Sequence, residues 1–151
     1  MKKILFIAAA FLIGFSATAQ QKADDIVKVK SEKFDFGKIK QNSPVTTYFE
    51  ITNKSDKPVV IETATASCGC TTPEFAKEPI APGSSTKIKV GYNAAAMGIF
   101  NKDIFVKLAG AQDTKNLKIT GEVLDAAAYD AFVKQNSQKS KTPPAKSVKS
   151  S

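Results

Sequence analysis

Apolar side chains recur at every second position through most of the middle of this chain. The clearest example is residues 86–92, where Ile88, Val90 and Tyr92 alternate with two lysines and a glycine. Successive side chains of a strand point to opposite faces, so this period of two predicts strands with one buried face. The period expected of an amphipathic helix is nearly absent between residues 26 and 123. The pattern predicts an all-β protein.

Turn signals divide the alternating region into about seven strands, at the spacing typical of an antiparallel β-sandwich. Gly37, Pro82 and Gly83 are the expected turn residues, and Pro-Gly favours a type II turn. Residues 71–78 are expected to be irregular because prolines interrupt and follow them. The expected strands are residues 26–29, 34–39, 45–51, 59–66, 86–92, 100–108 and 117–123.

Five phenylalanines fall at strand spacing, and we expect at least four of them in the core. The exception is Phe105, which lies on the opposite face from Ile104, Val106 and Leu108 and is expected at an edge or rim. The five are Phe34, Phe36, Phe49, Phe100 and Phe105.

The first residues have the three parts of a secretory signal. Two lysines precede an apolar run over residues 4–15, and Ala17-Thr18-Ala19 is a small-x-small cleavage site. We therefore expect a signal peptide over residues 1–19, cleaved after Ala19. The run is shorter than the roughly 20 residues of a membrane span, and no second run follows. The mature protein is expected in the periplasm or outside the cell, without a membrane span.

Three segments are expected in the mature chain: a sandwich domain over residues 20–125, a short helical segment over residues 126–133, and a disordered tail over residues 134–151. The helical segment has Tyr129 and Phe132 three positions apart. The tail is rich in Lys, Ser and Pro and has too few apolar side chains to offset the entropy of ordering.

Charge and composition argue against several function classes. The formal net charge is +8, of which the signal segment carries +2 and the tail +5, so the sandwich is nearly neutral. The chain contains no arginine, histidine or tryptophan. Arginine is the usual reader of guanine and clamp for phosphate, and histidine the usual general base, so neither nucleic-acid binding nor a catalytic triad is expected. We expect no catalytic residue and no cofactor.

The only two cysteines, Cys68 and Cys70, flank Gly69 at the end of an expected strand. On a flat strand such residues lie about 6.6 Å apart, whereas the Cβ atoms of a disulfide lie about 3.5–4.5 Å apart. A local disulfide therefore needs a bend, which Gly69 is expected to set. Four states stay open: a labile local disulfide, an intermolecular disulfide, a soft-metal dithiolate and two half-buried thiols.

The strand before the motif carries apolar residues on both faces, which predicts a central strand covered on both sides. Cys68 is expected to be more buried than Cys70. Replacing both with serine is expected to lower the free energy of unfolding by about 1–3 kcal/mol through lost burial. As a metal site, the pair would suit Cu(I), with Met97 as an added thioether, better than zinc, which prefers four ligands.

Together these pieces resemble the bacterial exported proteins of the domain-of-unknown-function 1573 family, over residues 32–123. The resemblance implies an Ig-like fold similar to Hydin/ASH and major-sperm-protein domains, and it brings no established activity. Asn42 stands where a turn glycine is expected, and asparagine tolerates left-handed geometry. The matching pieces are Phe34-Asp35-Phe36-Gly37-Lys38-Ile39, Tyr48-Phe49-Glu50-Ile51-Thr52-Asn53, Ser67-Cys68-Gly69-Cys70-Thr71, Ile80-Ala81-Pro82-Gly83, Ile88-Lys89-Val90-Gly91-Tyr92, Gly98-Ile99-Phe100 and Leu117-Lys118-Ile119-Thr120-Gly121-Glu122-Val123.

The expected function is that of a non-enzymatic exported Ig-like module that binds another envelope protein through a sheet edge or a loop end. The alternative is a Cu(I)-binding or redox-sensitive protein acting through Cys68 and Cys70.

Overall fold

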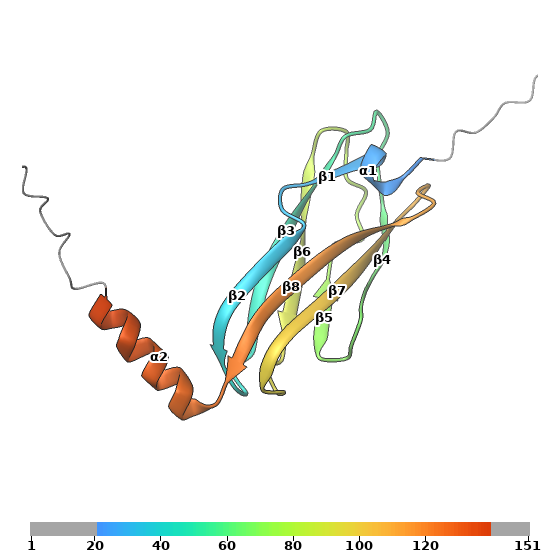
Figure 1. The fold of residues 1–151 in the computed structure, drawn as a ribbon. Helices are drawn as coiled ribbons and strands as arrows, with labels where there is room; N and C mark the ends of the chain where they lie inside the picture. The colour runs from blue at the N-terminus through green and yellow to red at the C-terminus, as the bar shows by residue number, and fades with distance from the viewer. Residues whose placement is uncertain (1–20, 140–151) are drawn as a thin grey trace, which may run out of the picture.

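The alternating segments form two sheets that pack face to face in the computed structural model, which describes residues 21–139 (Figure 1). One sheet has the order β1 (Val27–Val29), β3 (Val45–Asn53), β6 (Ser85–Tyr92), β5 (Thr71–Glu74), and all its pairs are antiparallel. The other has the order β2 (Lys33–Lys40), β8 (Thr114–Leu124), β7 (Gly98–Leu108), β4 (Ile61–Ala66), and only β2 and β8 are parallel. We call them the β3 sheet and the β8 sheet.

The core lies between the sheets and consists of the alternate residues that the period of two predicts. Ile88, Val90 and Tyr92 of β6 are buried, and Ile104, Val106 and Leu108 of β7 are fully buried. The Tyr92 and Phe100 rings stack across the interface with centroids 4.1 Å apart. The all-β sandwich predicted from the sequence is confirmed.

The structure has eight strands, because residues 71–74 form a strand that the sequence did not predict. β5 pairs with β6 even though it contains Pro73, which lies opposite Val90. Proline lacks a backbone N–H but is tolerated on an edge strand, where one side of the backbone needs no partner. The expectation of an irregular segment from Thr71 onward was therefore wrong for residues 71–74.

Fewer phenylalanines are buried than expected. Of the five considered, Phe49 and Phe100 are buried, and Phe36 packs partly against the core. Phe34 is 41% exposed because it lies near the start of the edge strand β2. Phe105 is 36% exposed on the outer face of β7, which is an inner strand of its sheet and not the edge that was expected.

Two of the predicted turns have the expected left-handed residue, since Gly83 and Asn42 have a positive φ of 74° and 57°. Gly37 also has a positive φ, of 64°, but it lies within β2 at a shift in register between Asp35 and Lys38, not in a turn between strands. The Ser84 N–H donates to the Ala81 carbonyl at 3.0 Å, which closes the turn through Pro82 and Gly83. Left-handed backbone at the third turn residue is what a type II turn requires.

Two helices flank the sandwich, and each differs from expectation. α1 (Ala23–Ile26) occupies the start of the expected first strand, and at four residues it is too short for a periodic signal. α2 (Ala126–Lys139) extends well past residue 133 and leads away from the sandwich (Figure 1). Residues 134–139 are thus helical, where a disordered tail was expected. Residues 1–19 and 140–151, with the expected signal peptide and the rest of the tail, lie outside the described residues.

Candidate functional site

The cysteine motif lies where the chain crosses from one sheet to the other. β4 of the β8 sheet ends at Ala66, and β5 of the β3 sheet begins at Thr71. The Ser67 N–H donates to the Asp103 carbonyl of β7 at 2.9 Å, while the Asn93 N–H donates to the Cys70 carbonyl at 3.1 Å. These two hydrogen bonds tie the crossover to both sheets.

A disulfide joins Cys68 and Cys70 within this crossover, and their Cα atoms are 5.3 Å apart. Of the four states considered for the pair, the structure has the local disulfide. The Thr71 hydroxyl lies 3.6 Å from the Cys68 sulfur and 3.9 Å from the Cys70 sulfur. The predicted position at a strand end and loop start is correct.

Two finer expectations about the motif were wrong. Both cysteines are half-buried, and Cys70, not Cys68, packs against the core. β4 is an edge strand rather than a central one. Its register shifts between Ile61 and Thr63, which accounts for apolar residues on both faces, since a bulge reverses the alternation. Gly69 lies in a turn of this crossover, and its φ is not positive, so the bend does not use left-handed glycine geometry.

The surroundings of the disulfide offer little for metal chemistry. Within residues 21–139, no three or more His, Cys, Asp and Glu side chains group closely enough to hold a metal ion. Met97 is 62% exposed. A hollow of about 190 Å³ adjoins Cys70, where Gly91 leaves space between Thr46 and Thr72.

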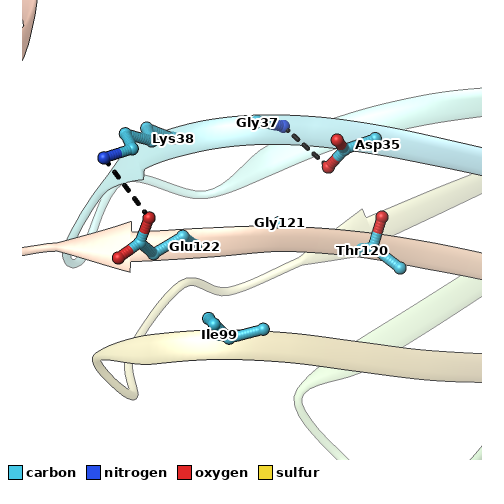
Figure 2. Close-up of a pocket in the computed structure, with 7 residues that line it drawn as sticks. All are labelled: Asp35, Gly37, Lys38, Ile99, Thr120, Gly121 and Glu122. Carbon is cyan, nitrogen blue, oxygen red and sulfur yellow. Dashed lines mark hydrogen bonds and ion pairs between the residues drawn. The ribbon is translucent and has the colours of Figure 1, made fainter.

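A larger hollow, of about 360 Å³, lies on the outer face of the β8 sheet, as Figure 2 shows. Its charged side chains are already engaged: Lys38 pairs with Glu122 at 3.5 Å, and Asp35 accepts from the Gly37 N–H at 3.0 Å. Ile99 at its border is 87% exposed. The rest of its lining consists of Thr120 and two glycines, Gly37 and Gly121.

A third hollow, of about 320 Å³, lies between the start of β2 and the edge of β3. Phe34 and Tyr48, which are 41% and 60% exposed, contribute its apolar surface. Lys30, Lys33 and Lys87 also line it, with Glu50 as the acidic member. The sequence reasoning missed this site because its residues come from separate segments. The one indication in the sequence was Tyr48, a large aromatic residue on the outward face of its alternating strand.

Lys115 is the one charged side chain that is buried among the described residues, and its contacts are structural. Lys115 of β8 bonds to Asp24 of α1 and to Glu32, which precedes β2, and is itself buried. Burial lowers the pKa of Lys115, but the hydrogen bonds and charges of the two carboxylates outweigh it and raise the pKa overall. This cluster fixes α1 and the β1–β2 connection on β8.

Two packed sheets, between which the chain crosses repeatedly, and a core of alternate apolar residues define an Ig-like β-sandwich domain. Residues 27–123 match the family model described as "Protein of unknown function (DUF1573)". The chain belongs to this family, as the sequence motifs predicted. No curated protein matches the sequence.

Solved structures share the fold at low sequence identity. A protein of unknown function from Porphyromonas gingivalis W83 is 20% identical with a TM-score of 0.57, over 72% of this chain and 51% of that one. The ASH/PapD-like domain 7 of human CEP192 is 8% identical with a TM-score of 0.59, over 81% of this chain and 99% of that domain. The VesB protease of Vibrio cholerae is 16% identical with a TM-score of 0.53, over 67% of this chain and 33% of that one.

These likenesses establish the fold alone. The chain spans about half of the Porphyromonas protein and a third of the VesB protease. None of the helices within residues 21–139 has the length and apolar character needed to cross a membrane.

Proposed function

We propose that this chain is a non-enzymatic, exported Ig-like module that binds another protein of the cell envelope through an open sheet edge. The observation that carries the proposal is the edge of β3. β1 pairs with β3 only from Ile51 to Asn53, and beyond it the Lys30 N–H donates to the Glu50 carbonyl. From Glu50 back to Val45, no described strand lies on that side of β3.

An open edge is a template for adding another strand, because its backbone donors and acceptors lack partners in the sheet. Domains that recognise extended peptides use such edges, with main-chain hydrogen bonds for affinity and side-chain pockets for specificity. The hollow formed by Phe34 and Tyr48 lies beside this edge and provides a pocket of that kind.

Two further observations support the remaining parts of the proposal. The lysine pair, apolar run and small-x-small site of residues 1–19 favour export to the periplasm or the exterior. The absence of histidine from the sequence, together with the paired charges of the hollow on the outer face of the β8 sheet, favours binding over catalysis.

Site-specific photocrosslinking in cells tests this function. A photoreactive amino acid at Tyr48 should give discrete adducts with one or a few envelope proteins, identified by mass spectrometry. The matched control is the same amino acid at Ile99, which is 87% exposed on the other sheet and should give none. Absence of adducts at Tyr48, or the same adducts at both positions, would contradict the proposal.

A second candidate, a redox-sensitive thiol pair, is favoured by the disulfide between Cys68 and Cys70. A ring closed over so short a loop is readily reduced when strained or exposed. Cu(I) binding would first require that reduction, because the thiolates are the metal ligands. Intact mass after thiol blocking, with and without copper under reducing conditions, separates the states. A pair that stays fully oxidised in mild reductant and binds no copper would exclude both roles.

A further inference from the structure

We propose that the open edge of β3 binds an extended acidic peptide segment of the partner, which adds to the sheet as a strand and places an apolar side chain between Phe34 and Tyr48. This inference rests on the proposed function and specifies the chemistry of the partner.

The direction of the backbone N–H and C=O groups shows which residues of β3 could pair with an added strand. In an antiparallel pair, alternate residues direct their N–H and C=O groups to one neighbour and the residues between them to the other. Asn53 bonds toward β6, through Ser84 and Gly83, whereas Glu50 and Lys54 bond toward the β1 side. By the same alternation, Thr46 and Tyr48 direct their backbone groups to the side where β1 has ended. Both residues are exposed.

This part of the β3 edge is open because the chain turns away from it after β1. After Lys30 the backbone turns toward the other sheet, where the Lys118 N–H donates to the Glu32 carbonyl and β2 begins beside β8. A peptide would continue the strand position of β1 along the remainder of β3, opposite Thr46 and Tyr48.

Charge along this part of the edge favours an acidic occupant. Lys30, Lys33 and Lys87 line the hollow, against Glu50 as its single acidic residue. Two adjoining hollows of about 410 Å³ also include Lys30, and one of them adds Lys28. The 3.9 Å contact between Lys30 and Glu50 joins side chains that are 83% and 41% exposed, so it neutralises little of this charge.

The aromatic side chains of the hollow favour a peptide that carries an apolar side chain as well as acidic ones. Phe34 makes an edge contact with Phe36 at 4.9 Å, which holds its ring at the border of the core while leaving 41% of the residue exposed. Buried Phe49 forms the floor of the hollow, and Tyr48 is 60% exposed at its rim. Exposed aromatic side chains beside a polar rim are typical of recognition sites.

A set of labelled heptapeptides tests the proposal with the full mature chain, by fluorescence anisotropy. The probe is Glu-Val-Glu-Phe-Glu-Val-Glu, and its twin has lysine in place of each glutamate. Two more twins carry N-methyl groups on alternate backbone nitrogens, in the two possible phases, which blocks strand hydrogen bonds without changing side chains. We expect the lysine twin and at least one methylated twin to bind at least tenfold more weakly.

Protein variants supply the complementary half of the test. Lys30→Glu/Lys33→Glu should weaken binding of the acidic probe at least tenfold, whereas Lys57→Glu/Lys77→Glu, with the same change in net charge away from this hollow, should change it less than twofold. Thr46→Pro removes an edge N–H and should abolish binding, and Thr46→Val, which keeps it, should not. Circular dichroism verifies that each variant is folded.

The outcomes separate this inference from the proposed function. Equal binding of the acidic and lysine probes, or binding unaffected by methylation in either phase, would overturn the acidic-strand inference. If no probe binds while Tyr48 still crosslinks a partner, the inference is wrong and the interaction function stands. If both experiments are negative, both fall, and the lysines only protect the edge from self-association.

Discussion

Gly121 shows how a single missing side chain positions the aromatic part of the core. A Cβ at this position of β8 would lie 2.7 Å from Cζ and 2.8 Å from Cε1 of Phe100, and 2.9 Å from the Gly37 carbonyl oxygen. Phe100 is the residue opposite Gly121 in β7, and its ring stacks on Tyr92. The glycine therefore creates the space that the stacked pair occupies.

Gly121→Ala should lower the free energy of unfolding by about 1–3 kcal/mol, because the added methyl group overpacks a ring and a backbone carbonyl. Gly69→Ala is the matched control, since a Cβ there meets no atom within 4 Å and the φ angle is not positive. We expect its effect to stay within about 0.5 kcal/mol. Urea titration of both variants measures the difference, and equal losses would refute the steric argument.

Among the elements, the strands next to two of the sheet crossovers decide where the β3 sheet has accessible edges. The crossover after β1 leaves β3 open from Val45 to Phe49. The crossover between β4 and β5 contains the disulfide, and β5 covers part of β6. The two sides of the β3 sheet are therefore unlike. On one side, the short strand β5, tied through Cys70, covers residues 89–92 of β6, and on the other side β1 leaves most of β3 free for a partner.

The first half of α2 contacts the sandwich through side chains of β2. Lys40 pairs with Asp130 at 3.6 Å, and the Lys38 ammonium lies 5.3 Å from the centroid of the Phe132 ring. A third contact is local, since Asp125 accepts a hydrogen bond from the Ala128 N–H at 2.8 Å and so caps the start of the helix. Each of these contacts is exposed or only partly buried, so each contributes little alone.

Removal of residues 134–151 should therefore shift the thermal midpoint by less than about 2 °C, because it leaves the three contacts of the first half of α2 in place. Removal of residues 125–151 eliminates those contacts, and we expect a larger decrease, of roughly 4–8 °C for each kcal/mol lost by a domain of this size. Differential scanning calorimetry compares the two truncations. A large decrease from the shorter truncation would mean that residues beyond 133 make stabilising contacts.

For the whole molecule, two buried groups link stability to alkaline pH. Burial raises the pKa of Tyr92 in the folded state above its ordinary value of about 10. As the pH rises past that value, the tyrosine of the unfolded chain ionises first, so unfolding becomes more favourable. Lys115, with its raised pKa, acts in the same direction: its contribution is complete below about pH 10.4 and is lost as the pH passes its folded-state pKa.

Tyr92→Phe should therefore lose less stability than the wild type between about pH 9 and 11. Tyr48→Phe is the control, since Tyr48 is 60% exposed, and it should follow the wild-type curve. Urea midpoints across this pH range for the three proteins provide the measurement. Parallel curves for wild type and Tyr92→Phe would show that Tyr92 does not contribute to the alkaline transition.

The sequence by itself determined the local properties of this protein. Alternation placed Ile88, Val90, Ile104 and Val106 correctly in the core, and the Pro-Gly dipeptide placed a left-handed turn at Gly83. The motif pieces identified the family, and the cysteine motif marked the end of a strand, with the local disulfide as one of four alternatives for Cys68 and Cys70. These features depend on a few consecutive residues, whose side-chain direction and turn geometry are set by local backbone sterics.

Only the tertiary structure decided which strand lies beside which. It made β4 an edge strand, paired β5 with β6 despite Pro73, left Phe34 half-open to solvent, and brought Lys30, Lys33 and Lys87 around one hollow. A strand's own alternation specifies its two faces but not its two edges, because edge pairing depends on partners distant in the sequence. The edge of β3 is open because β1 is short and the chain then turns to the other sheet. This feature depends on how the strands are arranged in space, so no single segment of the sequence predicts it.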